Sequence, residues 1–208
     1  MKYLARLAIL SLCCAGVLVA VPTTSTDIRR IDFKNFQFPW DEDMGVVFSV
    51  PKLWRWIDPL PDGRIRVVRG IHHFYERTQD PEERRRAPLI SVDAVTYGDL
   101  DGDGIEEAAV HLNYSPGGTQ NWDFLYIYKL NGGRPLLLGV LESGSRAYGG
   151  LVRTSITEGF LVLDFADAER RVGDCCSEGY IRVRFRWKDG GFHEEGPQER
   201  GDLELKVK

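Results

Sequence analysis

The chain has 208 residues, which is enough for one domain with a sizeable core, or at most two small ones. Hydrophobic residues make up 43% and charged residues 28%, an ordinary globular composition that argues against disorder of the body. The formal net charge is -4, so nucleic-acid-binding proteins, which usually carry a basic excess, are disfavoured as a class.

The N-terminus has the organisation of a secretory signal peptide. Lys2 and Arg6 provide a positive start, and residues 7–20 follow without a charge and are largely apolar. We expect cleavage after Ala20, so that residues 1–20 are the signal peptide and the mature protein is periplasmic or secreted. The apolar run is shorter than the ~20 residues of a spanning helix, which favours cleavage over an uncleaved anchor. No transmembrane span is expected after cleavage.

Cys13 and Cys14 raise the alternative of a lipid-anchored protein. A lipidation signal needs a small residue directly before the modified cysteine, but Leu12 or Cys13 stands there, and the segment after Cys14 stays apolar. Ordinary export is therefore favoured over lipoprotein anchoring. An exported chain meets an oxidising compartment, in which cysteines form disulfides.

Alternation with period two dominates the rest of the chain and predicts strands. Within residues 180–187, apolar side chains fall on one face, whereas Arg182, Arg184 and Arg186 fall on the other. Residues 189–191 carry a hairpin turn signal before a return strand. The same pattern predicts strands over residues 64–69, 89–97, 108–114, 122–130, 135–141, 151–157 and 160–165.

These strands predict a mainly β fold, a single antiparallel β-meander or sandwich-like domain with little helix. The domain is expected over residues 61–208, and residues 21–60 form an N-terminal extension that packs on it. Within the extension, residues 31–40 are expected as an extra strand. A last edge strand is expected at 203–207, and a helix of one or two turns at 80–86.

One loop carries the motif with chemistry. Residues 99–107 contain five acidic residues and no basic residue. Asp99, Asp101 and Asp103 occupy the first, third and fifth positions of a calcium-binding loop, and Gly104 follows at the position of the sharp turn. Carboxylate oxygens at this spacing can curl around one hard cation, and an irregular oxygen cage suits Ca²⁺ better than Mg²⁺.

The second half of the loop supplies two further expected ligands, the backbone carbonyl of Ile105 and the carboxylate of Glu107. The twelfth position is Val110 rather than the bidentate glutamate of an EF-hand, and strands flank the loop, so we expect a structural Ca²⁺ site on a β-hairpin and not a calcium switch. Two carboxylates about 4 Å apart repel by about 4 kcal/mol at an effective dielectric of about 20, so a converging cluster favours an ion. The alternative is an exposed acidic turn whose carboxylates point into water.

The sequence around this loop resembles a group of exported bacterial proteins that includes the LppP/LprE-type lipoproteins. The residues that carry the resemblance are Tyr97 to Gly104, Glu107 to Val110, Gly117 to Thr119, and Cys175-Cys176 before the strand at 180–187. The resemblance covers residues 60–195 and implies an exported β-rich domain of unassigned function, with no catalytic set. Ser177 stands where relatives often have proline. The loop alone is similar to the calcium hairpins of FG-GAP repeat proteins, but it occurs once, so a propeller is not expected.

Cys175 and Cys176 are the two cysteines left after signal cleavage, and they are adjacent. Their Cα atoms lie about 3.8 Å apart, closer than in usual disulfides. Three interpretations are open: a disulfide that stiffens the turn before the next strand, two reduced thiols, or a redox-active site. The structural role is preferred, because neither a Cys-x-x-Cys spacing nor a neighbouring histidine is present.

The function predicted from the sequence is an exported, non-enzymatic binding or structural protein of the bacterial cell envelope, with an envelope or extracellular ligand and one structural Ca²⁺ ion. No catalytic residue is predicted. The alternative is a periplasmic or secreted enzyme of the hydrolase type whose active site carries no sequence motif; Ser145 lacks the Gly-x-Ser-x-Gly surroundings of a nucleophile. The arginine face of residues 180–187 is interpreted as a solvated strand face rather than an anion site.

Overall fold

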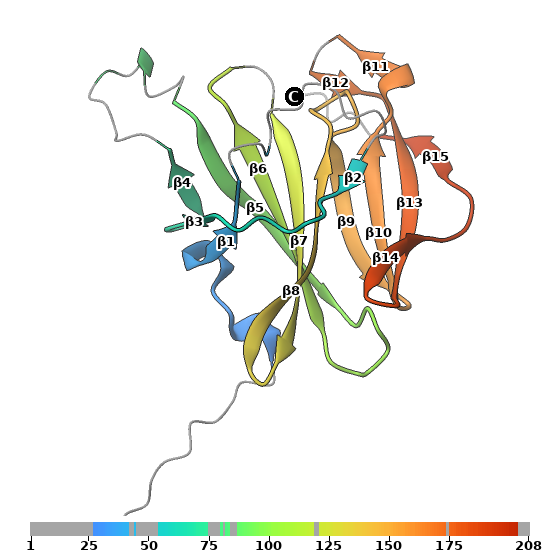
Figure 1. Cartoon of the computed structure of the whole chain (residues 1–208). Helices are drawn as coiled ribbons and strands as arrows, with labels where there is room; N and C mark the ends of the chain where they lie inside the picture. Colours follow the sequence, from blue (N-terminus) through green and yellow to red (C-terminus); the bar gives the residue numbers. More distant parts are fainter. Residues whose placement is uncertain are drawn as a thin grey trace, which may run out of the picture.

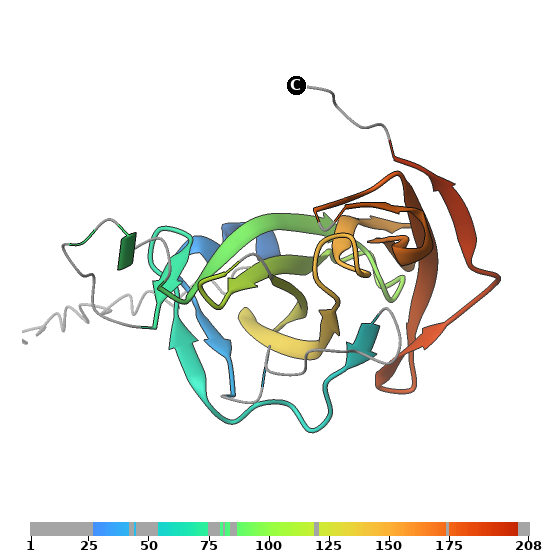
Figure 2. The same ribbon diagram turned by 90° about the horizontal axis from the view of Figure 1, so that it is seen from above.

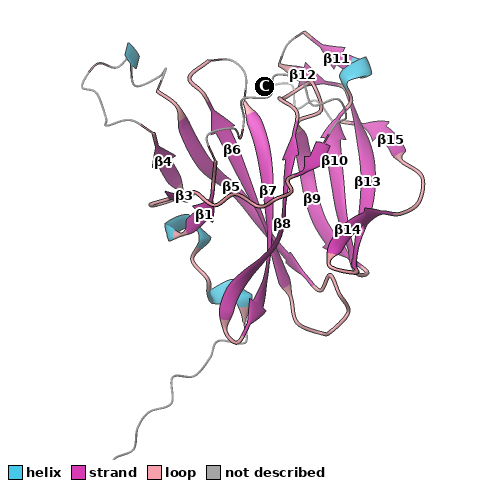
Figure 3. Cartoon of the chain, in the orientation of Figure 1, coloured by secondary structure: helices cyan, strands magenta, loops and turns pink. Residues whose placement is uncertain are grey.

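The structure, a computed structural model, describes residues 27–41, 44, 54–74, 80, 82–83, 87–118, 121–173 and 175–203. The predicted signal peptide lies outside this part, as does most of the short helix predicted at 80–86. The fold is mainly β with antiparallel pairing, as predicted, and the strands arrange as an open sandwich (Figures 1 and 3). Among the described residues, no helix has the length and apolar character needed to cross a membrane.

The larger sheet has six strands in the order β2-β8-β7-β6-β5-β4. Its strands are β2 (Trp54–Trp56), β4 (Ile71–His73), β5 (Leu89–Gly98), β6 (Glu107–Ser115), β7 (Trp122–Asn131) and β8 (Arg134–Ser143). Consecutive strands pair from β4 to β8, so this sheet is the predicted meander, and the short strand β2 is added at its edge.

The smaller sheet has five strands in the order β14-β13-β10-β9, with β15 also paired to β13. Its strands are β9 (Leu151–Thr157), β10 (Phe160–Ala166), β13 (Gly179–Lys188), β14 (Gly191–Glu194) and β15 (Glu199–Asp202). Two further pairs lie outside both sheets, β1 (Gln37–Pro39) with β3 (Arg64–Arg66), and β11 (Arg171–Val172) with β12 (Cys176–Ser177). The predicted hairpin around residues 189–191 is confirmed, because β13 pairs with β14.

Figure 2 shows the two sheets from above. They pack on each other through their apolar faces. Alternate residues of β10 and β13 point inward and meet residues of β7 and β8. These inward residues are Leu161, Leu163, Phe165, Ile181, Val183, Phe185, Leu125, Ile127 and Leu141. The period-two pattern of the sequence therefore corresponds directly to one of the two cores.

The N-terminal segment covers the opposite face of the six-stranded sheet. Ile28, Phe33, Phe38 and Trp40 are buried in a second core against β6 and β7, and the Tyr126 hydroxyl donates to the Pro39 carbonyl at 2.7 Å. Part of the predicted extension thus packs on the body.

The strand predicted at residues 31–40 is wrong over most of its length, because only Gln37–Pro39 is extended. Two 3-10 helices, Ile28–Arg30 and Phe33–Asn35, precede it. Each begins after an aspartate whose side chain accepts a backbone N–H two residues on, which gives the chain a local alternative to strand pairing.

The C-terminal edge strand lies earlier than predicted. It is β15, Glu199–Asp202, and Leu203 follows it outside the strand. Of the predicted strand at 203–207, the remaining residues lie outside the described part. The third 3-10 helix, Ala168–Arg170, joins β10 to β11.

The arginines on the outer face of β13 are paired with carboxylates. Arg182 Nε lies 2.7 Å from Asp164 Oδ1, Arg184 Nη2 lies 2.8 Å from Glu199 Oε1, and Arg186 Nε lies 3.2 Å from Glu195 Oε2. This arrangement agrees with the interpretation of a solvated strand face, since each arginine already has an acidic partner.

Gly98, at the end of β5, brings the acidic loop against the smaller sheet. A Cβ atom at this position would lie 2.6 Å from Ile156 Cγ2 and 3.1 Å from the Ile156 carbonyl oxygen. Gly98→Ala is therefore expected to lower the free energy of unfolding by about 1–3 kcal/mol through overpacking, measured by urea denaturation. Gly118→Ala is the control, because nothing lies within 4 Å of its added Cβ. Equal effects of the two substitutions would contradict the close packing.

Candidate metal site

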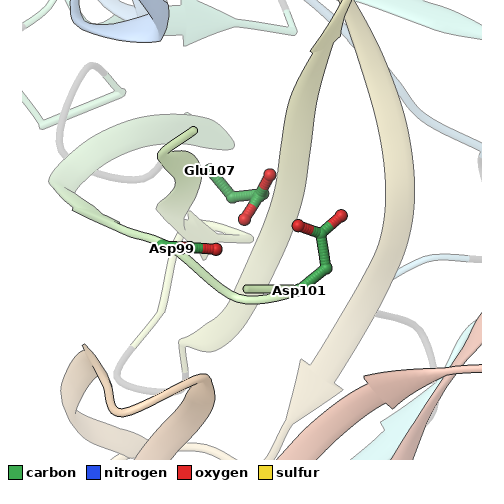
Figure 4. A group of neighbouring side chains, drawn as sticks. All are labelled: Asp99, Asp101 and Glu107. Carbon is green, nitrogen blue, oxygen red and sulfur yellow. The ribbon is translucent and has the colours of Figure 1, made fainter. Parts of the chain in front are cut away.

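The acidic loop connects β5 to β6 at one end of the larger sheet (Figure 1). Gly98 and Glu107 are directly opposite each other in the strand register, so the loop starts and ends at one place. The carboxylates of Asp99, Asp101 and Glu107 point toward one another (Figure 4), and one oxygen from each lies within 4.8 Å of the others. The structure thus brings together three of the four predicted carboxylate ligands.

Asp99 shapes the loop through its own backbone contacts. Its Oδ1 accepts from the Gly102 N–H at 2.7 Å, and its Oδ2 accepts from the Gly104 N–H at 2.9 Å. Both glycines have a positive φ angle, 79° and 83°, which residues with a Cβ atom rarely adopt. The Asp-x-Asp-Gly-Asp-Gly spacing therefore lets one aspartate hold two turns of the loop while its oxygens face the cluster.

Asp103 and Ile105 differ from the expected ligand arrangement. Asp103 does not join the converging group, and its Oδ1 instead accepts from the Ile105 N–H at 2.7 Å. Ile105 is exposed, and its carbonyl as a ligand stays a prediction. Asp101 makes the same kind of contact, accepting from the Asp103 N–H at 3.3 Å, and still belongs to the converging group.

Glu107 is the buried member of the cluster, with 1% of its surface exposed. Its Oε2 accepts from the Leu100 N–H at 2.7 Å. Burial raises the pKa of Glu107 to about 7, and repulsion from Asp101 and Asp103 raises it further. The hydrogen bond from the Leu100 N–H and the charge of Lys129 lower this pKa, but by less than burial raises it. Glu107 therefore takes up a proton at a higher pH than an exposed glutamate does.

Lys129 on β7 is a counter-charge that the sequence did not point to. Its Nζ lies 3.0 Å from Asp101 Oδ2, and this hydrogen bond is the main cause of the raised pKa of Lys129. The repulsion within the cluster is thus reduced by three features of the chain itself: a lysine from a neighbouring strand, a raised glutamate pKa, and an aspartate turned to its own backbone. A divalent cation at this site would compete with the ammonium group for Asp101.

Glu106, the fifth acidic residue of the loop, faces away from the cluster toward the N-terminal segment. Arg29 binds it in a bidentate manner, with Nε 2.5 Å from Oε2 and Nη2 2.8 Å from Oε1. The Arg29 hydrogen bond lowers the pKa of Glu106. Arg29 also lies over the ring of Tyr97, 4.5 Å from its centroid. This contact ties the loop to the N-terminal segment.

The carboxylate cluster is open to solvent on one side. Asp99 and Asp101 line an open cleft of about 380 Å³, together with Ile156, Glu158 and Arg186. The cleft lies between the acidic loop and the β9–β10 turn, so both sheets contribute to it. A cation could reach the two aspartates from this side, whereas Glu107 would bind it from the protein interior.

The cysteine pair lies away from this loop, at the hairpin of β11 and β12. Cys175 and Cys176 are bonded to each other, with their Cα atoms 3.8 Å apart. Cys175 is exposed and Cys176 half-buried.

A polar cluster that the sequence analysis missed lies between the sheets. Asp123 is 7% exposed, and its Oδ1 lies 2.9 Å from His111 Nε2 and 2.8 Å from Asn113 Nδ2. Its Oδ2 accepts from the Leu151 N–H at 3.0 Å. Polar residues at alternate positions of two strands were the available signal. Because Leu151 begins β9, the cluster connects the two sheets.

The sequence was compared with models of protein families, with curated proteins and with solved structures, and none of the three comparisons finds a match.

Proposed function

We propose that this protein is an exported, non-enzymatic binding or structural protein of the bacterial cell envelope that carries one structural Ca²⁺ ion in the loop between β5 and β6. The observation that carries the metal proposal is the convergence of Asp99, Asp101 and Glu107, whose oxygens lie within 4.8 Å of one another. The proposed export is supported by the sequence of residues 1–20, and the resemblance to LppP/LprE-type proteins by the motifs around the loop.

The chemistry of the donor set supports a hard cation. Three carboxylates offer only oxygen, with no histidine or cysteine in the group, and oxygen ligands suit Ca²⁺ and Mg²⁺ rather than Zn²⁺. The loop is irregular, with Asp99 and Asp101 before its two glycine turns and Glu107 after them. Such a loop favours Ca²⁺, because Mg²⁺ demands near-ideal octahedral geometry. In this role the ion would link Asp99 and Asp101 on the loop to Glu107 on β6, and so hold the loop against the sheet.

A thermal melt with and without cation tests the site. We expect 1 mM CaCl₂ to raise the melting temperature over the value in EDTA by a few degrees, since a ligand at about ten times its Kd stabilises the folded state by about 1.4 kcal/mol. Magnesium at the same concentration is expected to have a smaller effect.

Two substitutions distinguish the loss of a metal ligand from the loss of any negative charge in the loop. Asp101→Asn removes one ligand charge and is expected to abolish most of the calcium effect. Glu106→Gln removes the same charge from a neighbouring residue that pairs with Arg29 outside the group, and is expected to retain it. No shift with calcium in the unmodified protein, or an equal loss in both variants, would refute the proposed site.

The hydrolase alternative gains no support from the contacts described above. His111 contacts Asp123, but this pair lies between the sheets, and it lines neither the cleft at the acidic loop nor a second open cleft of about 260 Å³ beside Phe160 and Arg184. The binding or structural role is therefore the function that we put forward.

A further inference from the structure

The hairpin of β11 and β12 carries the disulfide on a largely exposed segment of the chain. Val172 pairs with Cys176 across the hairpin, and Cys175 lies in the connecting turn. Cys175 is the exposed residue of the pair and Cys176 is the half-buried one, so we expect attack from solution at Cys175. Figure 1 shows this hairpin at the edge of the molecule, above the smaller sheet.

The bridge contributes little as a cross-link. A disulfide stabilises a protein mainly by restricting the unfolded chain, and this effect grows with the number of residues in the loop that it closes. Cys175 and Cys176 have a sequence separation of 1, so their bond encloses no intervening residue. It also joins no two elements that would otherwise separate.

The hairpin is attached to the body by hydrogen bonds that do not involve the sulfurs. The Ser177 hydroxyl lies 2.8 Å from the carbonyl oxygens of both Asp167 and Gly179, and the Glu178 N–H donates to the Arg170 carbonyl at 3.0 Å. Arg170 Nη2 in turn lies 2.6 Å from Asp202 Oδ1 on β15. These contacts can persist with the bridge open, which separates the redox state of the cysteines from the stability of the fold.

From the exposure of the bridge and its independence from the fold, we infer that Cys175–Cys176 is a reversible thiol–disulfide exchange site for a dithiol. A thiolate of the dithiol attacks Sγ of Cys175, the Cys175–Cys176 bond breaks, and Cys176 leaves as a thiolate that takes up a proton. The second thiol of the partner then attacks the mixed disulfide, and Cys175 is released as a thiol. Two electrons and two protons pass to the protein, the dithiol becomes a disulfide, and the reverse reaction restores the bridge.

Native reduction tests this inference on the full chain. The folded protein is incubated with dithiothreitol, and a portion is then incubated with oxidised glutathione. Both samples are alkylated, and the mass of the tryptic peptide 172–182 is measured. We expect complete reduction and complete reoxidation, with the melting temperature of the two forms within about 2 °C. A bridge that resists reduction until the protein unfolds, a melting temperature lowered by more than about 5 °C on reduction, or two free thiols before any reductant is added would each overturn the inference.

A matched pair of variants tests the order of attack. In Cys176→Ser the remaining thiol is the exposed one, and in Cys175→Ser it is the half-buried one. We expect Cys176→Ser to form a mixed disulfide with oxidised glutathione about tenfold faster than Cys175→Ser, because access to the sulfur limits the rate. Circular dichroism of both variants verifies that they fold. Equal rates in two folded variants would contradict attack at Cys175.

Discussion

Replacing Asp123 by alanine is expected to lower the free energy of unfolding by about 3 kcal/mol or more, the largest effect that we predict for one polar side chain. Its two oxygens lie close to His111, Asn113 and the backbone N–H of Leu151, and 93% of the residue is removed from water, as its 7% exposure shows. Without the carboxylate, the Leu151 N–H loses its acceptor where β9 begins. Asp123 therefore supports the contact between the two sheets at this point, beside their shared apolar core.

Two substitutions make this prediction specific. Asp123→Asn keeps the size and one acceptor oxygen, but turns an amide donor toward groups that also donate, so an intermediate loss of about 1–2 kcal/mol is expected. Asp93→Ala removes an exposed carboxylate that accepts from the Ser91 hydroxyl at 2.6 Å, and is expected to change stability by no more than about 0.5 kcal/mol. Urea unfolding curves measure all three. A loss for Asp123→Ala no larger than that for Asp93→Ala would show that the cluster does not hold the sheets together.

The stability of the cation-free protein is expected to fall as the pH rises from about 5 to 8, because of Glu107. Its pKa is about 7 in the folded protein and 4.5 in the unfolded reference, so the folded state binds the proton more tightly. The stability from this group is fully present below pH 4.5, and is lost as the pH rises through 4.5 and up to about 7. The difference amounts to about 3 kcal/mol above pH 8. Melting temperatures in EDTA across this range measure it.

Glu107→Gln isolates this contribution. A glutamine can still accept from the Leu100 N–H, but it carries no charge into the buried position. We therefore expect the variant to be about 2 kcal/mol more stable than the unmodified protein at pH 8 in EDTA, and nearly equal to it at pH 5. It is also expected to lose the stabilisation by calcium, because a neutral amide replaces a carboxylate ligand.

Asp103→Asn is the control for the same experiment. Its side chain can still accept from the Ile105 N–H, and it lies outside the converging group, so the pH dependence in EDTA is expected to stay close to that of the unmodified protein. If Glu107→Gln instead follows the unmodified protein at every pH, the glutamate is ionised without cost in the folded state. Burial of Glu107 would then be no reason to expect a cation beside it.

The hairpins of this protein could be predicted because their signals are local. The alternation in residues 180–187 and the turn at residues 189–191 specify β13, its inward face and its partner β14 within a short stretch of chain. The same holds for the acidic loop, whose spacing of aspartates and glycines specified where the chain turns. The strand predicted at residues 31–40 was wrong over most of its length, because Asp32 caps a 3-10 helix at Phe33–Asn35.

The membership of the candidate site could be predicted only in part. Asp99, Asp101 and Glu107 follow from the loop spacing, but the same spacing also predicted Asp103, which lies outside the converging group and accepts from the Ile105 N–H. Lys129 is separated from Asp101 by 28 positions in the sequence, and reaches it because β7 lies beside β6 in the sheet. No spacing rule within the loop could have indicated this lysine.

The sequence by itself determined the strands, their turns, the faces that they bury and the loop in which carboxylates gather, since each of these depends on neighbours a few residues away. Only the tertiary structure decided that the strands divide into two packed sheets, that an N-terminal segment covers the outer face of one of them, and that Asp123 joins the two. It also decided which charges of the loop are balanced from within the protein. Such contacts are formed by residues far apart along the chain, and their partners are selected by packing rather than by any local preference.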